Sequence, residues 1–317
     1  QMELEGVSSD SIKFVCSLRA CGHVEAINKG KQLHCQITGN ELLKSNQFVG
    51  SCLVDMYARY GLFVEAHQVF NSLSVQTVVT WTSLITGYAN YGQGEEALKF
   101  FEKMQLQRVT PNAITIICIL KACGVVGITS KGRELHDDIE KRGFLESDSV
   151  IGSSLVNMYA KCGSIIKAQE VFDNLEVRNV VSWTALMAGY AQIGQNENVF
   201  HIYDEMIGDG IQPNQVTFVV ILNACSRLGQ LHKSLLYFHM MSKDYCISPT
   251  IEHHSCMIDL VGRIGQLDKA TTMIEEMPFR PNLVVWHSLL GACQKSGNLS
   301  TGKWAFQYST DAILAVS

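Results

Sequence analysis

Apolar residues recur along this chain in pairs of stripes, each with the three- and four-residue spacing of a helix face. Between Val180 and Asn214, one stripe runs from Trp183 to Tyr190 and a second from Val199 to Met206. Gly194 separates the stripes, and Pro213 ends the second helix because the residue before a proline avoids the helical region. The pattern predicts helix, turn, helix. A single hairpin cannot bury both stripes, so neighbouring hairpins must stack on one another.

The same pattern returns at regular intervals. The segment VVSWTALMAGYAQIGQ from Val180 has the counterpart VVTWTSLITGYANYGQ from Val78, 102 residues earlier. One glycine stands between the two helices of each unit, at steps of 31, 35, 36, 31, 35, 36 and 32 residues: Gly61, Gly92, Gly127, Gly163, Gly194, Gly229, Gly265 and Gly297. Glycine suits a tight turn between helices because it adopts positive φ without a Cβ clash. One step earlier, Glu25 takes the place and departs from the rule.

This periodicity divides the chain into stacked units. Residues 1–10 resemble the tail of a truncated repeat. Eight repeats follow within residues 11–282, at 11–46, 47–77, 78–112, 113–148, 149–179, 180–214, 215–250 and 251–282. A ninth unit occupies residues 283–317, and we expect it to become irregular from residue 308. Trp81, Trp183 and Trp286 share the fourth place of their units, which indicates a role in the core.

Composition narrows the class of protein. An apolar content of 47% can supply a continuous core, and a net charge of −5 argues against loose, charge-driven nucleic-acid binding. It does not exclude recognition of base edges. Four of the eleven cysteines share the eleventh place of their units, Cys21, Cys123, Cys225 and Cys293, where a small apolar group packs well. We therefore expect reduced thiols. No run of about 20 apolar residues exists, so no membrane span is expected.

Three cycling repeat lengths with motifs in fixed order resemble the plant pentatricopeptide-repeat family, in the subclass whose P-type, L-type and S-type motifs alternate. The motifs are VVSWTALMAGYAQIGQ (P-type), LVNMYAKCGSIIKAQEVFDNL (S-type) and TIICILKACGVVGITSKGRELH (L-type). IEHHSCMIDLVGRIGQLDKATTMIEEMP resembles the last S-type motif, and VVWHSLLGACQKSGNLSTGKWAF the E-type motif after it. The resemblance implies an all-α, right-handed α-solenoid that binds single-stranded RNA in plant organelles, usually to direct C-to-U editing.

The resemblance also implies which residues read the RNA. In this family the fifth and the last residue of a repeat read one base together, and Thr or Ser with Asn favours adenine. Four pairs match: Thr82 with Asn112, Ser153 with Asn179, Thr184 with Asn214, and Ser255 with Asn282. Ser51 with Thr77 would make a weaker base contact. The L-type units carry Val15, Ile117 and Val219 at the fifth place and are expected to be spacers. The predicted target is n-n-A-n-A-A-n-A.

The second residue of most repeats is apolar, and such a row can wedge between successive bases. Its members are Phe48, Val79, Ile114, Val150, Val181, Val216 and Val284. The structural alternative for the terminal residues is simple: an Asn at a repeat boundary is also a good N-cap for the next helix. The two roles can coexist.

No catalytic centre is expected. His23, Val24 and Glu25 match the HxE element of a zinc deaminase but have no Cys-x-x-Cys partner. The cluster of His253, His254 and Cys256 matches no standard zinc spacing. We therefore predict an RNA-binding adaptor without enzyme activity, cofactor or metal. Its C-terminal unit would recruit a partner protein that carries the deaminase.

Two alternatives remain open. A factor for RNA stability or splicing would need the same fold and the same groove. A protein-interaction scaffold of the tetratricopeptide type has similar offsets, but it keeps one 34-residue period, whereas this chain varies its period. The resemblance places the protein in the mitochondrion or the chloroplast. We expect no transit peptide among the residues given.

Overall fold

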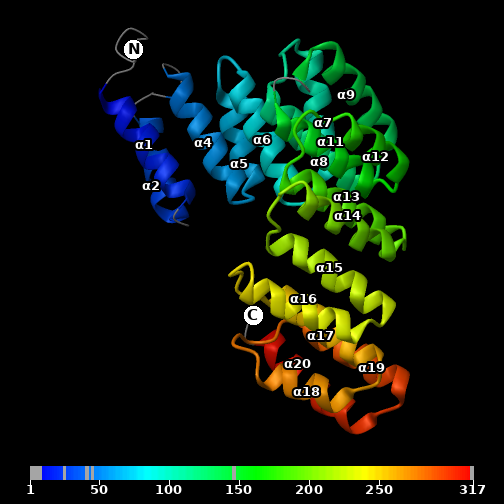
Figure 1. Ribbon diagram of the computed structural model, residues 1–317. Coiled ribbons are helices and arrows are strands. Elements are labelled where there is room, and N and C mark those ends of the chain that lie inside the picture. Colours follow the sequence, from blue (N-terminus) through cyan, green and yellow to red (C-terminus); the bar gives the residue numbers. More distant parts are fainter. Residues whose placement is uncertain (1–8, 24–25, 40–42, 44–45, 145–147, 315–317) are drawn as a thin grey trace. The chain divides into compact units, whose positions relative to one another are not determined.

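The computed structural model describes the chain except residues 1–8, 24–25, 40–42, 44–45, 145–147 and 315–317. Within the described residues it contains eighteen α-helices and no strand, which confirms the all-α prediction (Figure 1). The chain falls into two compact units, Gln1–Ser164 and Ile165–Ser317. In each unit, helical hairpins follow one another and stack.

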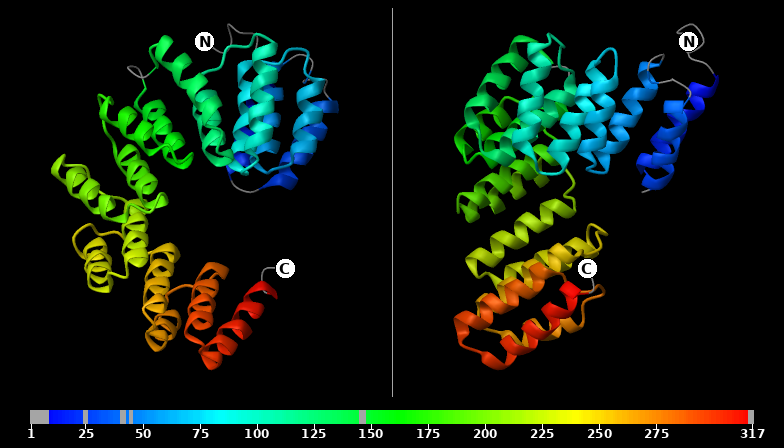
Figure 2. Two further views of the ribbon diagram at one scale, coloured as in Figure 1. Left: turned by 90° about the vertical axis from the view of Figure 1, so that its right-hand side faces the viewer. Right: turned by 180° about the vertical axis from the view of Figure 1, so that it is seen from behind.

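In the first unit, α1, α4, α6, α8 and α11 are the first helices of successive hairpins, and each packs against the next (Figure 2). The second helices α2, α5, α7 and α9 pack against their own first helices. The bounds are α1 Ser9–His23, α2 Ile27–Gly39, α4 Gln47–Arg59, α5 Phe63–Ser72, α6 Val78–Asn90, α7 Gly94–Leu106, α8 Ala113–Val126, α9 Thr129–Lys141 and α11 Ser149–Lys161.

The second unit is built in the same way, with α13, α15, α17 and α19 as consecutive first helices. It opens with α12, which packs on α13. The bounds are α12 Ile165–Asp173, α13 Val180–Gln192, α14 Asn196–Gly208, α15 Gln215–Leu228, α16 Leu231–Lys243, α17 Ile251–Arg263, α18 Leu267–Glu275, α19 Leu283–Ser296 and α20 Leu299–Leu314.

Local chemistry sets where the helices begin and end. The first helices from α4 onward begin at residues 47, 78, 113, 149, 180, 215, 251 and 283, which are also the first residues of the repeats that we propose. The glycines between the helices all have φ between 69° and 85°. Gly127 shows why: it caps α8 in the left-handed region and donates its N–H to Cys123 O. Glu25, which takes the place of this glycine in the first repeat, lies outside the described residues.

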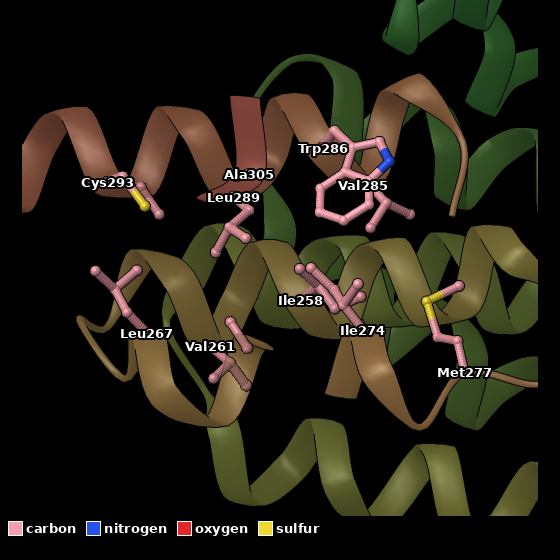
Figure 3. Close-up of a cluster of buried hydrophobic side chains, with 12 residues drawn as sticks. Ile258, Val261, Leu267, Ile274, Met277, Val285, Trp286, Leu289, Cys293 and Ala305 are labelled. Carbon is pink, nitrogen blue, oxygen red and sulfur yellow. The ribbon is translucent and has the colours of Figure 1, made fainter. Parts of the chain in front are cut away.

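The core lies between the two helices of each hairpin and the next hairpin. Trp81 and Trp183 are 2% exposed, and each meets a phenylalanine of the preceding hairpin edge to face, Phe70 at 4.7 Å and Phe172 at 4.6 Å. Figure 3 shows the equivalent cluster around Trp286, where side chains of α19 point towards those of α17 and α18. The indole N–H of each tryptophan is buried without a hydrogen-bond acceptor within the described part of the chain. These positions are packing positions, as the sequence predicts.

The cysteines at the eleventh place are also packing residues. Cys123 and Cys225 are fully buried, and all cysteines of the chain are free thiols. Burial raises the pKa of the Cys123 thiol to about 12, so the thiol is neutral at physiological pH. None of the helices described combines the length and the apolar character that a bilayer crossing needs.

Both ends of the helical array differ from the prediction. Helix α1 begins at Ser9, two residues before the first complete repeat that we expected. At the other end we expected irregular structure from residue 308, but α20 continues to Leu314. Trp304 and Tyr308 both pack against Trp286, with ring centroids 5.5 and 6.1 Å away, and no glycine or proline follows Gly302. The aromatic contacts therefore extend the helix beyond the repeat pattern.

Candidate nucleic-acid interface

A row of exposed apolar side chains stands at the start of the first helices. In seven of the nine units the second residue is apolar and between 52% and 59% exposed, at Phe48, Val79, Ile114, Val150, Val181, Val216 and Val284. Phe48, Val79, Ile114 and Val150 lie on the first helices of four consecutive hairpins, α4, α6, α8 and α11. They therefore form a regular series along the stack of the first unit. The fold does not need them for its core. An exposed, aligned apolar series is typical of a binding surface.

The predicted pair of Thr82 and Asn112 is linked by a residue of the next repeat. The Thr82 and Thr115 Oγ1 atoms are 2.7 Å apart, and Thr115 Oγ1 donates to Asn112 Oδ1 at 2.8 Å. The Thr82 hydroxyl also has Val78 O as an acceptor at 2.7 Å. Thr115 is completely buried, whereas Asn112 is half-buried. The structure thus brings the predicted pair together, through a threonine that the sequence analysis did not single out.

The predicted pair of Thr184 and Asn214 has the same arrangement. The hydroxyl oxygens of Thr184 and Thr217 are 2.9 Å apart, and Thr217 Oγ1 donates to Asn214 Oδ1 at 3.1 Å. Each relay threonine is the third residue of its repeat, 33 residues after its partner on the preceding first helix. We call Thr115 and Thr217 the relay threonines. The signal that could have found them is the recurrence of Thr at the third place of repeats 113–148 and 215–250.

Ser51 and Ser255 lack such a relay among the described contacts. The hydroxyls of Ser51, Ser153 and Ser255 donate to the carbonyl four residues earlier, at 2.8, 2.9 and 2.7 Å. In the unit that follows Ser255 and Asn282, the third residue is Val285, which has no hydroxyl. Ser153 lies in the first unit and Asn179 in the second. Thr77, the partner proposed for Ser51, accepts instead from Thr80 N–H at 3.4 Å.

The terminal asparagines do cap the next helices. Asn112, Asn214 and Asn282 each accept a hydrogen bond from the backbone N–H three residues later, at 2.9, 3.0 and 3.1 Å. Asn179 accepts from Ser182 N–H at 3.0 Å. A cap occupies only the oxygen of the amide. In the described hydrogen bonds of Asn112 and Asn214, Nδ2 donates to no protein acceptor, so two N–H donors remain for a ligand.

Basic residues recur at the far end of the first helices, and the sequence analysis missed them. Arg59, Lys161 and Arg263 all occupy the thirteenth place of their repeats and are exposed. The two arginines pair with Asp55 and Asp259 at 2.7 Å, with the guanidinium about half exposed in both cases. A cation at a helix C-terminus is favourable in itself. Their common register, which was visible in the sequence, places a positive charge at the C-terminal end of each of these three first helices.

A polar hollow of about 310 Å³ lies beside the first of these cations. It is lined by residues of α1, α4 and α6, among them Asp55, Arg59, Thr86 and Asn90. On the next first helix, Lys121 Nζ donates to Asn90 Oδ1 at 2.8 Å. The polar side chains that line the hollow therefore come from two consecutive hairpins, those of α4 and α6.

The candidate metal clusters of the sequence are structural or incomplete. His253 is fully buried: Nδ1 accepts from Thr250 N–H at 3.1 Å, and Nε2 donates to Gln215 O at 2.9 Å. Burial lowers the pKa of His253, which favours the neutral ring. Among the described residues, no group of three His, Cys, Asp or Glu side chains could hold a metal ion. Of the HxE element, Val24 and Glu25 lie outside the described residues.

Comparisons with known proteins identify the repeats. Residues 76–124 and 178–227 match the PPR repeat family, and residues 51–75, 153–180, 216–246 and 252–280 match the PPR repeat. Together these matches cover well over half of the chain. A crystal structure of the pentatricopeptide repeat protein PPR10 in complex with an 18-nt psaJ RNA element has a similar fold, with a TM-score of 0.70 and 15% identity, over 89% of this chain and 42% of that chain.

Three relatives from Arabidopsis thaliana match almost the whole chain. A putative pentatricopeptide repeat-containing protein is 39% identical over 96% of this chain and 41% of its own length. The pentatricopeptide repeat-containing protein CRR2, chloroplastic, is 37% identical over 96% and 47%, and a putative mitochondrial one is 35% identical over 96% and 49%. The chain spans less than half the length of these relatives. With its stacked hairpins, its repeat matches and these relatives, the chain belongs to the pentatricopeptide-repeat family.

Proposed function

We propose that this chain is a sequence-specific adaptor for single-stranded RNA. The observation that carries the proposal is the exposed apolar row at the second place of the repeats, beside hydroxyl and amide groups held in register by the relay threonines. The similar structure of PPR10 is a complex with an RNA element, so RNA is the ligand that this fold accommodates there. The matched repeats belong to a non-enzymatic family, and the chain acts by binding.

The donors and acceptors of the P-type pairs suit adenine. Its Watson–Crick edge offers one acceptor, N1, beside one donor group, N6–H₂. Asn112 Nδ2 can donate to N1, while a lone pair of the Thr82 hydroxyl can accept from N6–H₂. Uracil, whose N3–H donor lies between two carbonyl acceptors, reverses this pattern. The same chemistry applies to Thr184 with Asn214, and we extend it to Ser153 with Asn179 and to Ser255 with Asn282.

The apolar row and the cations would hold the strand. Aromatic stacking contributes about 1–3 kcal/mol per base, and aliphatic contacts contribute less. With a net charge of −5, binding cannot depend on bulk attraction to phosphates, so a few placed cations such as Arg59, Lys161 and Arg263 would supply the contacts to the backbone. Contacts to the bases should then provide most of the affinity for RNA, and the same contacts should provide the sequence specificity.

Within this function, we propose recognition of a site for C-to-U editing. The alternation of P-, L- and S-type motifs and the E-type character of residues 283–317 support this assignment. A deaminase supplied in trans would perform the chemistry, recruited through the C-terminal unit. The names of the relatives point to the chloroplast and the mitochondrion, and we place this protein in one of these organelles.

The test is fluorescence anisotropy with an RNA that carries adenine opposite the four pairs. The same RNA with uracil opposite repeat 180–214 is the comparison, with wild type and with the double variant Thr184→Asn, Asn214→Asp. We expect the double variant to change its preference from adenine to uracil at that one nucleotide. If neither RNA binds and the variant changes nothing, the proposal is wrong, and the hairpins form a protein scaffold instead.

A further inference from the structure

One repeat breaks the apolar row with a charged residue. The second residue of repeat 251–282 is Glu252, which is exposed at the start of α17. Helix α17 packs between α15 and α19, whose second residues are Val216 and Val284, both exposed like the rest of the row. A carboxylate therefore stands in line with aliphatic side chains, where a base would otherwise find an apolar contact.

Glu252 is fixed in place by the last residue of the preceding repeat. Thr250 Oγ1 donates to Glu252 Oε2 at 2.6 Å, and the Thr250 N–H donates to His253 Nδ1 at 3.1 Å. The hydrogen bond from Thr250 holds the pKa of Glu252 below its usual range, so the carboxylate is ionised at neutral pH. None of the described ion pairs includes Glu252. The neighbouring His253 is buried in its neutral form and brings no compensating charge.

Repeat 215–250 lacks the usual pair of side chains, at its fifth and last places, that could donate hydrogen bonds to a base. Its fifth residue, Val219, has no hydrogen-bonding side chain, and the hydroxyl proton of its last residue, Thr250, faces two acceptors within the protein, Glu252 Oε2 at 2.6 Å and His253 Nδ1 at 2.8 Å. The groups that this pair could offer a base are therefore reduced to lone pairs of Thr250. Beside them lies Glu252, a carboxylate that accepts hydrogen bonds and cannot donate them. Every group available at this step of the row is thus an acceptor.

We propose that Glu252 gives repeat 215–250 a base preference of its own, for guanine and against uracil. This inference rests on the proposed RNA-binding function. The guanine Watson–Crick edge presents two adjacent donors, N1–H and N2–H₂, which match the two oxygens of a carboxylate. Adenine and cytosine each present one amino group. Uracil presents a single N3–H between two carbonyl oxygens, which a carboxylate repels. The affinity for RNA should be highest with guanine opposite repeat 215–250, lower with adenine or cytosine, and lowest with uracil.

The experiment uses the whole chain and four RNAs that differ only in the nucleotide opposite repeat 215–250, with adenine opposite the four reading pairs. For wild type we expect guanine to bind about tenfold more tightly than uracil, the discrimination typical of a charge-assisted hydrogen bond. Glu252→Gln should lose most of this difference, because an amide both donates and accepts. Glu252→Val should bind all four RNAs equally and more tightly than wild type, because it restores the apolar row and removes a negative charge.

Glu275→Gln is the matched control, because it makes the same change of charge at an exposed position of α18, a second helix. It should leave the base preference unchanged. Equal binding of the four RNAs by wild type, or the wild-type order retained in Glu252→Val, would overturn the inference. A fifth RNA, with uracil opposite Thr184 and Asn214, separates the two proposals. If it binds more weakly while Glu252 has no effect, only this inference fails; if no RNA binds, both fail.

Discussion

Replacing the relay threonine Thr115 by valine tests how the reading pair is held. Valine keeps the shape of the side chain and removes a hydroxyl that contacts Asn112 Oδ1 at 2.8 Å and Thr82 Oγ1 at 2.7 Å. Both neighbours keep a partner: Asn112 still accepts from the backbone N–H at residue 115, at 2.9 Å, and the Thr82 hydroxyl proton, released from Thr115, has Val78 O as an acceptor at 2.7 Å. No buried group is left unpaired, so the loss of stability should be about 1 kcal/mol.

The effect on RNA should be local. Without the hydroxyl, Asn112 and Thr82 are no longer linked, and adenine preference opposite repeat 78–112 should fall several-fold, with the other nucleotides unaffected. Thr80→Val is the matched control: Thr80 is equally buried and is also a third residue, but its hydroxyl donates to Thr77 O at 2.8 Å. It should cost similar stability and leave the adenine preference of Thr82 and Asn112 intact.

Urea unfolding followed by circular dichroism, with both variants under identical conditions, measures the first effect, and fluorescence anisotropy measures the second. The two variants are compared with each other because the cooperativity of a repeat array depends on its nearest-neighbour contacts. A loss above about 3 kcal/mol in Thr115→Val would show that the hydroxyl supports more than one hydrogen bond. An equal loss of adenine preference in both variants would refute the relay.

Four further outcomes follow from the structure. Gly127→Ala should lower the thermal midpoint, because φ is 82° and a Cβ there costs about 1–2 kcal/mol, whereas Gly291→Ala, inside α19 with open space around the added Cβ, should raise it slightly. Val181→Asp should leave the unfolding midpoint nearly unchanged, because the side chain is 55% exposed, while RNA affinity in anisotropy falls; an unchanged affinity would remove Val181 from the interface. Arg263→Gln should reduce the slope of log affinity against log salt concentration by about 1, and an unchanged slope would mean that this cation touches no phosphate. The pKa of His253 is lowered in the fold from 6.5, so the unfolded chain binds the proton first; stability contributed by the neutral ring should be complete above pH 6.5 and fall as the pH drops below it, which thermal unfolding between pH 7.5 and 5 measures, with a weaker dependence in His253→Gln.

The sequence predicts the fold well because the information that decides it is local. Apolar stripes, turn glycines and capping asparagines each act within about four residues, and each recurs in nearly every hairpin. Gly194 and Asn214 can be assigned without knowledge of any distant contact. The prediction fails at the C-terminus, where α20 continues to Leu314, because Trp304 and Tyr308 reach back to Trp286 and this contact has no counterpart in the repeat pattern.

The site is only partly predictable for the same reason. The apolar row and the asparagines lie at fixed places of each repeat, and the resemblance to the family assigns them. Thr115 and Thr217 act across 33 residues, on the hydroxyl of the preceding first helix, so their role depends on how two hairpins stack. The hydrogen bond from Thr250 to Glu252 is local. That Glu252 interrupts an apolar row becomes clear only from the stacking of α17 between two helices that carry valines at the same place.

The relay threonines also bear on how such chains can be recombined. The groups that would read one base in repeats 78–112 and 180–214 are completed by the first turn of the following repeat. A repeat cut out at its own boundary and spliced in front of a foreign neighbour would lose the third residue that positions its asparagine. The transferable cassette is therefore longer than the sequence period, and a graft that keeps its specificity must carry at least three residues of the next repeat with it.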